Sequence, residues 1–206
     1  MLDKYIVPRI KPSLATLAAS LDRAGVKADT VTVTGFVIGL ACIPAVAYGY
    51  TQLALMLLLI NRLADGLDGE LARLHRSTDA GGYLDITLDF VFYAIFPLGF
   101  AFADPVNNAL PAAVLIASFV GTGASFLAFA TQAEKRDMVS PDFGYKSLYY
   151  LNGLAEGTET IICFALMCVF PQYFAIIAWV FAAICGVTEI NRIYYGYRTL
   201  QSRHNK

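Results

Sequence analysis

Charged side chains are scarce in this sequence. Asp, Glu, Lys and Arg make up 15% of its 206 residues, whereas soluble domains hold about 25%. Hydrophobic side chains account for 57% and the mean hydropathy is +0.57, so an ordinary soluble domain is excluded. The formal net charge of −1 argues against a nucleic-acid partner. Four cysteines lie in apolar stretches without metal-ligand spacing, and we expect them to act as small hydrophobic residues: Cys42, Cys163, Cys168 and Cys185.

Long apolar stretches recur along the chain. Each has about 20 residues, enough for a helix to cross a hydrocarbon core of about 30 Å. They fall at about 30–49, 52–74, 83–103, 109–132, 148–170 and 172–196. We therefore expect an all-α integral membrane protein with six transmembrane helices in one domain.

The segment before the first predicted span is different in character. Charged residues and two prolines precede any long apolar run, so we do not expect a cleaved signal peptide. Leucines at helical spacing, Leu14, Leu17 and Leu21, predict an amphipathic helix at 13–24 that lies on the membrane surface. The chain is thus divided into an N-terminal segment 1–28, a membrane domain 29–198 and a tail 199–206.

Lysine and arginine are concentrated in alternate connections between the predicted spans. They are Lys4, Arg9, Lys11, Arg23 and Lys27 before the first span, Arg73 and Arg76 in the second turn, Lys135, Arg136 and Lys146 in the fourth, and Arg198, Arg203 and Lys206 at the end. Because cations favour the cytoplasmic side, both termini and the second turn are expected to face the cytoplasm.

Four aspartates interrupt the second and third predicted spans. Asp65 and Asp68 are spaced i, i+3, and Asp85 and Asp89 are spaced i, i+4, so each pair projects from one face of its helix. A charge at the bilayer centre costs about 2.5–3.5 kcal/mol, which indicates a functional role. The stretch between the pairs is short and contains helix breakers, so we expect the two helices to run antiparallel and to bring the carboxylates together.

Four neighbouring carboxylates repel one another unless cations balance them. Hard divalent cations prefer oxygen ligands, and Mg²⁺ or Mn²⁺ suits a carboxylate cage with open water positions. The sequence therefore predicts a centre for two divalent ions, an arrangement that serves phosphoryl transfer.

The full pattern is Asp65-x-x-Asp68-Gly69-x-x-Ala72-Arg73, seven residues, then Gly81-x-x-x-Asp85-x-x-x-Asp89. It resembles the motif of the CDP-alcohol phosphotransferase, or CDP-alcohol phosphatidyltransferase, family at every specified position. The resemblance implies that a substituted phosphate group passes from a CDP-linked lipid such as CDP-diacylglycerol to a small alcohol, with release of CMP, in phospholipid synthesis. It also implies a homodimer, and we expect the bacterial inner membrane as its location.

The resemblance also implies roles for the motif residues. The four aspartates hold the metals, and Asp89 is in addition the general base that takes the proton of the acceptor hydroxyl. The residues implied in CDP binding are Gly69, Ala72, Arg73, Gly81 and Thr32. Arg73 suits either a diphosphate or an acidic neighbour. Asp29 stands where the family tends to carry Asn in Asn-x-x-Thr, and it reads equally as an N-cap.

Candidate acceptor residues follow from polar groups in the later spans. Asn152, Glu156, Glu159 and Thr160 are spaced i, i+4, i+7 and i+8, which predicts a polar stripe inside the bundle. These side chains suit either a hydroxylated or amino-bearing acceptor or a hydrogen-bonded helix contact. Lys146 and Arg192 are cations at the same side, which a phosphate-bearing acceptor requires and which topology alone also explains.

Three other functions fit parts of the pattern. A CDP-aminoalcohol donor with diacylglycerol as acceptor fits the same motif. A divalent-cation transporter also uses acids within the membrane, but predicts acids in both leaflets and inverted repeats, which we do not find in the sequence. An aspartyl intramembrane protease needs only two acids and leaves Arg73 and the glycines unexplained.

Overall fold

The computed structural model describes residues 3–75, 77–136 and 155–202, and within these residues the secondary structure is helical, without strands. The helices are α1 Asp3–Arg23, α2 Ala28–Leu40, α3 Cys42–Ala47, α4 Thr51–Leu74, α5 Asp79–Ile95, α6 Leu98–Ala103, α7 Pro105–Glu134, α8 Gly157–Val169 and α9 Phe174–Ser202, with a short 3-10 helix at Pro171–Tyr173 before α9.

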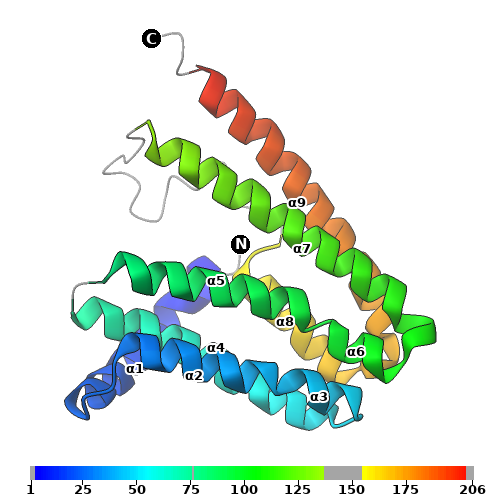
Figure 1. The fold of residues 1–206 in the computed structure, drawn as a ribbon, viewed down its shortest axis with the longest axis horizontal. Coiled ribbons are helices and arrows are strands. Elements are labelled where there is room, and N and C mark those ends of the chain that lie inside the picture. The colour runs from blue at the N-terminus through cyan, green and yellow to red at the C-terminus, as the bar shows by residue number, and fades with distance from the viewer. Residues whose placement is uncertain (1–2, 76, 137–154, 203–206) are drawn as a thin grey trace.

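Two groups of helices make up the bundle (Figure 1). Helix α2 packs against both α4 and α5, and α1 packs against α4. Helices α7 and α9 form a long pair, which joins the first group where α7 packs against α5 and α6. Helices α4 and α5 follow one another in opposite directions, as the short turn between them predicts.

Four helical segments among the described residues are long and apolar enough to cross a membrane. They are 28–47, 79–103, 105–134 and 171–201. Helix α4 has 24 residues, but charged side chains occupy its second half. Helix α8 is apolar but has only 13 residues, because it begins at Gly157, after the extended backbone of Glu156, rather than at the start of the predicted span 148–170. The chain is thus a helical membrane protein, while the number of six spans is not confirmed.

Helix α7 begins earlier than the predicted boundary at 109. The Asp104 carboxylate accepts hydrogen bonds from the backbone N–H of Asn107 at 3.1 Å and from its side-chain amide at 2.7 Å. Pro105 occupies the first helical position, where its fixed φ suits the helix and its missing N–H costs nothing. This N-cap starts α7 at Pro105. The sequence analysis left residues 104–108 between two predicted spans, but of these only Asp104 lies outside a helix, so this boundary was wrong.

The predicted polar stripe on one helix is also wrong at Glu156. Its backbone is extended, with φ −123° and ψ −172°, and α8 begins only at the next residue, Gly157. Glycine disfavours a helix interior, so the chain enters the helix here rather than continuing through it. The carbonyl of Glu156 accepts bonds from the backbone N–H and the hydroxyl of Thr160. Asn152 lies outside the described residues.

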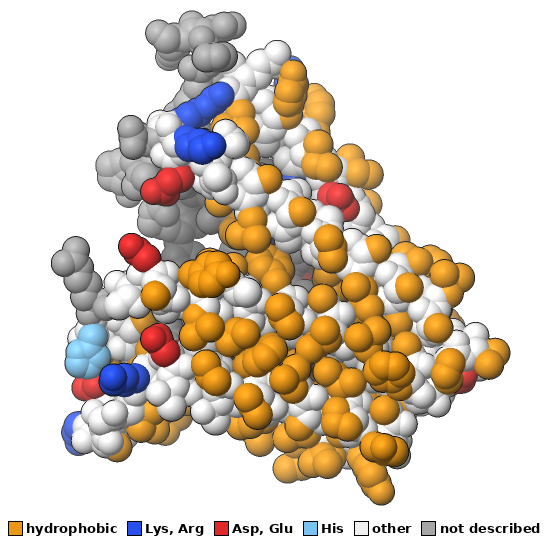
Figure 2. All heavy atoms as spheres, viewed as in Figure 1, with side chains coloured by type: hydrophobic (Ala, Val, Ile, Leu, Met, Phe, Trp, Pro, Cys, Tyr) orange, Lys and Arg blue, Asp and Glu red, His pale blue; other side chains and the backbone are white. Residues whose placement is uncertain are grey.

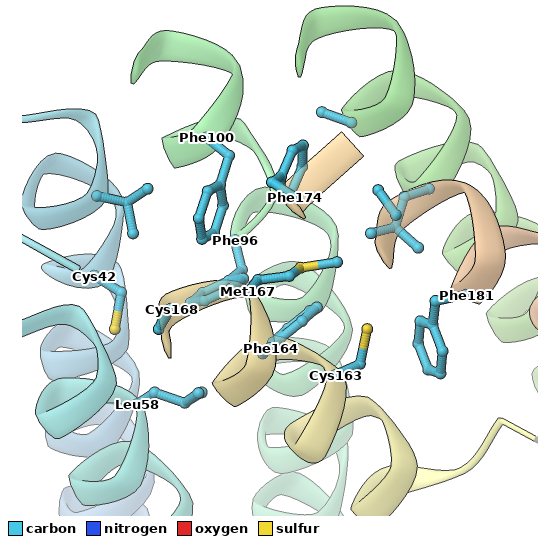
Figure 3. Packing of buried hydrophobic residues seen from close by; sticks show 14 of the residues in the cluster. Cys42, Leu58, Phe96, Phe100, Cys163, Phe164, Met167, Cys168, Phe174 and Phe181 are labelled. Atoms are coloured by element: carbon cyan, nitrogen blue, oxygen red, sulfur yellow. The ribbon is translucent and has the colours of Figure 1, made fainter. Parts of the chain in front are cut away.

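Aromatic side chains dominate the buried core (Figure 3). The rings of Phe96 and Phe164 stack with centroids 4.1 Å apart, and those of Phe100 and Phe174 stack at 4.4 Å. Phe96 directly follows α5, and the other rings come from α6, α8 and α9, so these pairs join elements distant in sequence. The predicted role of the cysteines is confirmed, because all four are buried and free, as Figure 3 shows for Cys42.

Helix α1 is longer than the predicted 13–24 and runs through both prolines. Ala18 is fully buried, and Leu14 packs over Gly66 of α4, so part of its apolar side faces the protein. Leu17 remains 48% exposed. One side of α1 is therefore fixed to α4, at the edge of the bundle.

Figure 2 shows how charge is distributed over one face of the molecule. Hydrophobic side chains cover most of this face, and most of the charged side chains gather at one end. That end holds the turn between α4 and α5 and the last turns of α7. Such a distribution is typical of a membrane protein with one polar end.

Candidate active site

Two glycines of α2 allow α4 and α5 to approach. A Cβ atom on Gly35 would lie 2.6 Å from the Cβ of Ala64 in α4. A Cβ atom on Gly39 would lie 2.9 Å from Asn61 Nδ2 and 3.0 Å from the ring of Phe92 in α5. Small residues allow this close contact between helix backbones. Helix α2 thereby holds α4 and α5 in the positions that bring their carboxylates together.

The four motif aspartates meet where α4 and α5 face each other. Asp65, Asp85 and Asp89 each offer a carboxylate oxygen, and these three oxygens lie within 4.8 Å of one another. Asp68 lies one turn along α4 from Asp65 and is only 4% exposed. The Thr32 side chain from α2 is in hydrogen-bonding reach of the Asp68 carboxylate.

The donor set fits a hard divalent cation. All four predicted ligands offer carboxylate oxygens, which suit Mg²⁺ or Mn²⁺. Oδ2 of Asp68 is buried and accepts no hydrogen bond from any described residue. A buried carboxylate oxygen without a donor is costly, and a cation would supply the missing interaction. The residues present therefore fit the implied metal centre.

Arg62 is a residue of this site that the sequence analysis missed. Its guanidinium donates from Nη2 to Asp89 Oδ1 at 2.9 Å, and its Nη1 lies 3.7 Å from Asp65 Oδ2. The side chain is only 8% exposed. A signal was present in the sequence, because Arg62 interrupts an apolar segment three residues before Asp65 and so shares its helix face.

A larger cavity of about 530 Å³ opens beside the carboxylates. Its size is that of a typical small-molecule site. The predicted CDP-binding residues Thr32, Gly69, Ala72, Arg73 and Gly81 all line it, together with Asp68 and Asp85. The sequence analysis missed another part of the lining, which comes from the end of α1, the turn that follows it and the end of α4: Asp22, Lys27 and His75.

Both interactions foreseen for Arg73 are compatible with its position. Its Nη2 donates to Glu70 Oε1 at 2.7 Å, and the Arg73 side chain is 58% exposed at the cavity. Although Glu70 is buried, the exposed guanidinium has further N–H donors that remain available to a ligand in the cavity. At the same rim, His75 Nε2 and Asp22 Oδ1 lie 2.6 Å apart and link α4 to α1.

Asp29 lines the cavity but does not cap α2. The N-cap is Lys27, which has no side-chain capping bond, and Asp29 lies in the first turn. A Cβ atom on Gly81 would lie 3.0 Å from Asp29 Oδ1. The N-cap interpretation is therefore wrong, and the carboxylate faces the start of α5 instead.

The family model of CDP-alcohol phosphatidyltransferases matches residues 26–190. The chain belongs to this family. Over 202 residues it is 51% identical to the inner membrane protein YnjF of Escherichia coli K12, and the match covers 98% of both chains. Its fold is similar to that of a Mycobacterium tuberculosis phosphatidylinositol phosphate synthase solved with CDP-DAG bound. The TM-score is 0.66 at 18% identity, over 89% of this chain and 93% of that one.

Membership in the CDP-alcohol phosphatidyltransferase family confirms the resemblance that the motif indicated, and supports an enzyme of lipid biosynthesis that transfers substituted phosphate groups. In this fold the motif residues come from α4 and α5, while Thr32 comes from α2. The family pattern therefore spans three helices, of which α4 and α5 both pack against α2.

The described candidate acceptor residues lie at the start of α8 and within α9. Glu159 is in the first turn of α8, with a buried Oε2 atom. Arg192 of α9 donates to the carbonyl of Thr122 in α7 at 3.2 Å and lies over the Phe126 ring. Glu156 is close enough to Arg192 for electrostatic attraction. Lys146 lies outside the described residues.

Glu159 lies on the same side of the aromatic core as the carboxylates. The Phe164 ring contacts the rings of Phe92 and Tyr93, which follow Asp89 on α5. On α8, Glu159 comes before Phe164; on α5, Asp89 comes before Phe92 and Tyr93. In both helices the later turns enter the core, so Glu159 and Asp89 lie before it.

Proposed function

We propose that this protein transfers a phosphatidyl-type group from a CDP-linked lipid, such as CDP-diacylglycerol, to the hydroxyl of a small alcohol and releases CMP. The observation that carries the proposal is the cavity beside the four aspartates, which Thr32, Gly69, Ala72, Arg73 and Gly81 line. Family membership supports the reaction class. The similar fold of a synthase solved with CDP-DAG supports a CDP-lipid donor.

The binding roles follow from the chemistry of each position. Asp65, Asp68, Asp85 and Asp89 would hold two divalent ions, Mg²⁺ or Mn²⁺. Such ions, when bound, offset the charge of the transferring phosphoryl group and of the leaving phosphate. Arg73 would pair with the diphosphate, for which its fork of donors is suited.

Asp89 is proposed as the general base. The acceptor oxygen forms the new bond to phosphorus, its proton passes to the Asp89 carboxylate, and the bond from phosphorus to the oxygen of CMP breaks. Arg62 holds Asp89 Oδ1, so the carboxylate has a fixed orientation. The side chain of Asp89 is 28% exposed, which allows an acceptor to approach it.

We further propose six membrane spans, formed by α2 with α3, α4, α5 with α6, α7, α8 and α9. The membrane domain is 29–198, followed by a tail at 199–206, and α1 in segment 1–28 lies on the membrane surface. Both termini and the site face the cytoplasm of the bacterial inner membrane, and the protein forms a homodimer. The charged end of the molecule, which includes the turn between α4 and α5, supports this orientation (Figure 2).

For the acceptor we propose a site at Glu156, Glu159 and Arg192, with Lys146 as a further cation. Glu159 is on the carboxylate side of the aromatic core, and Glu156 is close to Arg192, which supports a shared site. Two glutamates beside one arginine favour a hydroxylated or amino-bearing acceptor over one whose only charge is a phosphate.

The test is a donor and acceptor panel with the purified protein in detergent. CMP release is measured from CDP-diacylglycerol with glycerol phosphate, serine, inositol-type alcohols and amino alcohols, in Mn²⁺ and after chelation. The proposal predicts metal-dependent CMP release with CDP-diacylglycerol and one acceptor class. Release only from a CDP-aminoalcohol with diacylglycerol would reassign the donor. Mn²⁺ binding without CMP release from any pair would instead favour ion transport.

A further inference from the structure

Arg62 connects the metal-site residues of α4 and α5, although it is outside the family motif. We propose that Arg62 is a positioning residue: a built-in cation that holds Asp89 and Asp65 in place and lowers the affinity of the carboxylates for metal. The inference rests on the proposed function, because it assigns Arg62 a part in that site.

The first observation is the contact with both helices. Arg62 lies on α4 and reaches Asp89 on α5 at 2.9 Å, while its other terminal nitrogen is 3.7 Å from Asp65 on its own helix. One guanidinium thus contacts two predicted metal ligands. Guanidinium remains charged at all relevant pH values, so this positive charge is permanent.

The second observation is that the guanidinium is fixed from several directions. Its Nε donates to Asn61 Oδ1 at 2.8 Å, and its Nη1 donates to the Tyr93 hydroxyl at 2.9 Å. Asn61 in turn donates to the carbonyl of Gly35 in α2 at 2.8 Å. This network ties Arg62 to α2, α4 and α5 together.

Aromatic rings close the remaining side. The guanidinium carbon lies 5.1 Å from the centroid of Phe92 and 5.2 Å from that of Tyr93, within the range of cation–π attraction. With an 8% exposed side chain, Arg62 has little room to turn away toward solvent. We therefore expect it to keep its place when a cation enters.

Two consequences follow, and they have opposite signs. A permanent positive charge beside Asp89 and Asp65 repels an incoming cation, so its removal strengthens metal binding. The same removal frees Asp89 to change rotamer, and misplacement of a catalytic group by about 1 Å can reduce turnover by about 100-fold. A residue that served only to support the fold would weaken metal binding on removal rather than strengthen it.

The experiment measures Mn²⁺ affinity by calorimetry in the absence of substrates, and kcat and KM for CMP release. We expect Arg62→Gln to bind Mn²⁺ roughly tenfold more tightly. Its kcat should fall by about 100-fold with little change in the KM of the donor. Arg62→Lys keeps the charge but loses the fork of donors, so it should retain the wild-type Mn²⁺ affinity and recover part of kcat.

Arg198 supplies a matched control. Its guanidinium also donates to a tyrosine hydroxyl, that of Tyr194 at 3.0 Å, and lies 5.5 Å from the ring centroid, but it makes no salt bridge with a carboxylate of the described residues. Arg198→Gln should change neither the Mn²⁺ affinity nor kcat. Tyr93→Phe removes one bond to Arg62 without a change in charge, so kcat should fall at unchanged Mn²⁺ affinity.

Equal or weaker Mn²⁺ binding by Arg62→Gln overturns the inference. If Arg62→Gln does not fold, Tyr93→Phe provides the test. An unchanged kcat in Tyr93→Phe would also contradict the positioning role of Arg62. The metal experiment is independent of the reaction. A wild-type protein that binds Mn²⁺ but releases no CMP refutes the proposed function, while the affinity of Arg62→Gln still tests the charge effect.

Discussion

Gly35 of α2 and Ala64 of α4 make a close helix contact beside the site, since a Cβ atom on Gly35 would lie 2.6 Å from that of Ala64. Ala64 directly precedes Asp65, so the contact fixes the helix turn that carries the first aspartate. One helix turn later, Gly39 of α2 meets both Asn61 and Phe92. The geometry of the carboxylates on α4 and α5 therefore depends on small residues of α2.

Gly35→Val should separate α2 from α4. Overpacking of a tight contact costs about 1–3 kcal/mol, and the shift should also weaken Mn²⁺ binding. Thermal unfolding in detergent and calorimetry check the two effects. Gly186→Ala in α9 is the control, because a Cβ atom there meets nothing within 4 Å and alanine favours a helix interior. Equal behaviour of both variants would contradict the role of Gly35.

Asp85→Asn should weaken Mn²⁺ binding by about 100-fold or more. Loss of a residue that only hydrogen-bonds to a metal ligand already lowers metal affinity by about 10–100-fold, and loss of a ligand should lower it further. Without metal, the same variant should unfold at a temperature no lower than wild type, since one of several repelling carboxylates is gone. Calorimetry and thermal unfolding give the two readouts. Glu134→Gln, at the exposed end of α7, should leave Mn²⁺ binding unchanged. Undiminished Mn²⁺ affinity in Asp85→Asn would exclude Asp85 as a ligand.

Arg73→Gln separates the two interactions of this side chain. If Arg73 pairs with the donor diphosphate, the KM for the CDP-linked donor should rise about tenfold, since charge-assisted hydrogen bonds contribute about 1.5–3 kcal/mol. The unfolding temperature should also fall, because the substitution breaks the pair with Glu70 and leaves its buried carboxylate without this cation. Glu70→Gln removes that pair but leaves the arginine, and should keep the donor KM. If Arg73→Gln and Glu70→Gln have the same donor KM, Arg73 acts only as the ion-pair partner of Glu70 and does not bind the diphosphate.

Glu159→Gln should raise the KM for the acceptor and leave the KM for the donor unchanged, because α8 lies apart from the nucleotide cavity lined by α1, α2, α4 and α5. Arg192→Gln should do the same if both side chains contact the acceptor. Initial rates at varied acceptor and fixed donor give these constants. A rise in both KM values would indicate a general disturbance of the bundle and would remove Glu159 from the acceptor site.

The sequence predicted the helical membrane class and the family from two strong regularities. Apolar stretches of membrane length define spans by composition alone, and the aspartates of the motif project from one face because helical spacing is fixed. Both features are local in the chain. The family match at residues 26–190 confirms the family that the motif indicated, while the proposed roles of single residues stay predictions.

Features that depend on contacts between distant residues were missed. Arg62 was overlooked because its importance arises from Asp89, 27 residues away. The role of Gly35 and Gly39 in helix packing becomes clear only from the contacts of α2 with α4 and α5 in the structure. Helix ends at Asp104 and Glu156 were misplaced, because capping bonds and a glycine set them rather than hydropathy.

CMP release from CDP-diacylglycerol by wild type and Asp89→Asn, side by side in Mn²⁺, tests the central claim most directly. The account predicts metal-dependent release with one acceptor by the wild-type protein. The variant should release none while it remains folded and keeps the three other aspartates. Equal release by Asp89→Asn and the wild type would contradict the assignment of Asp89 as the general base. No release by the folded wild type with any donor or acceptor would contradict the proposed reaction itself.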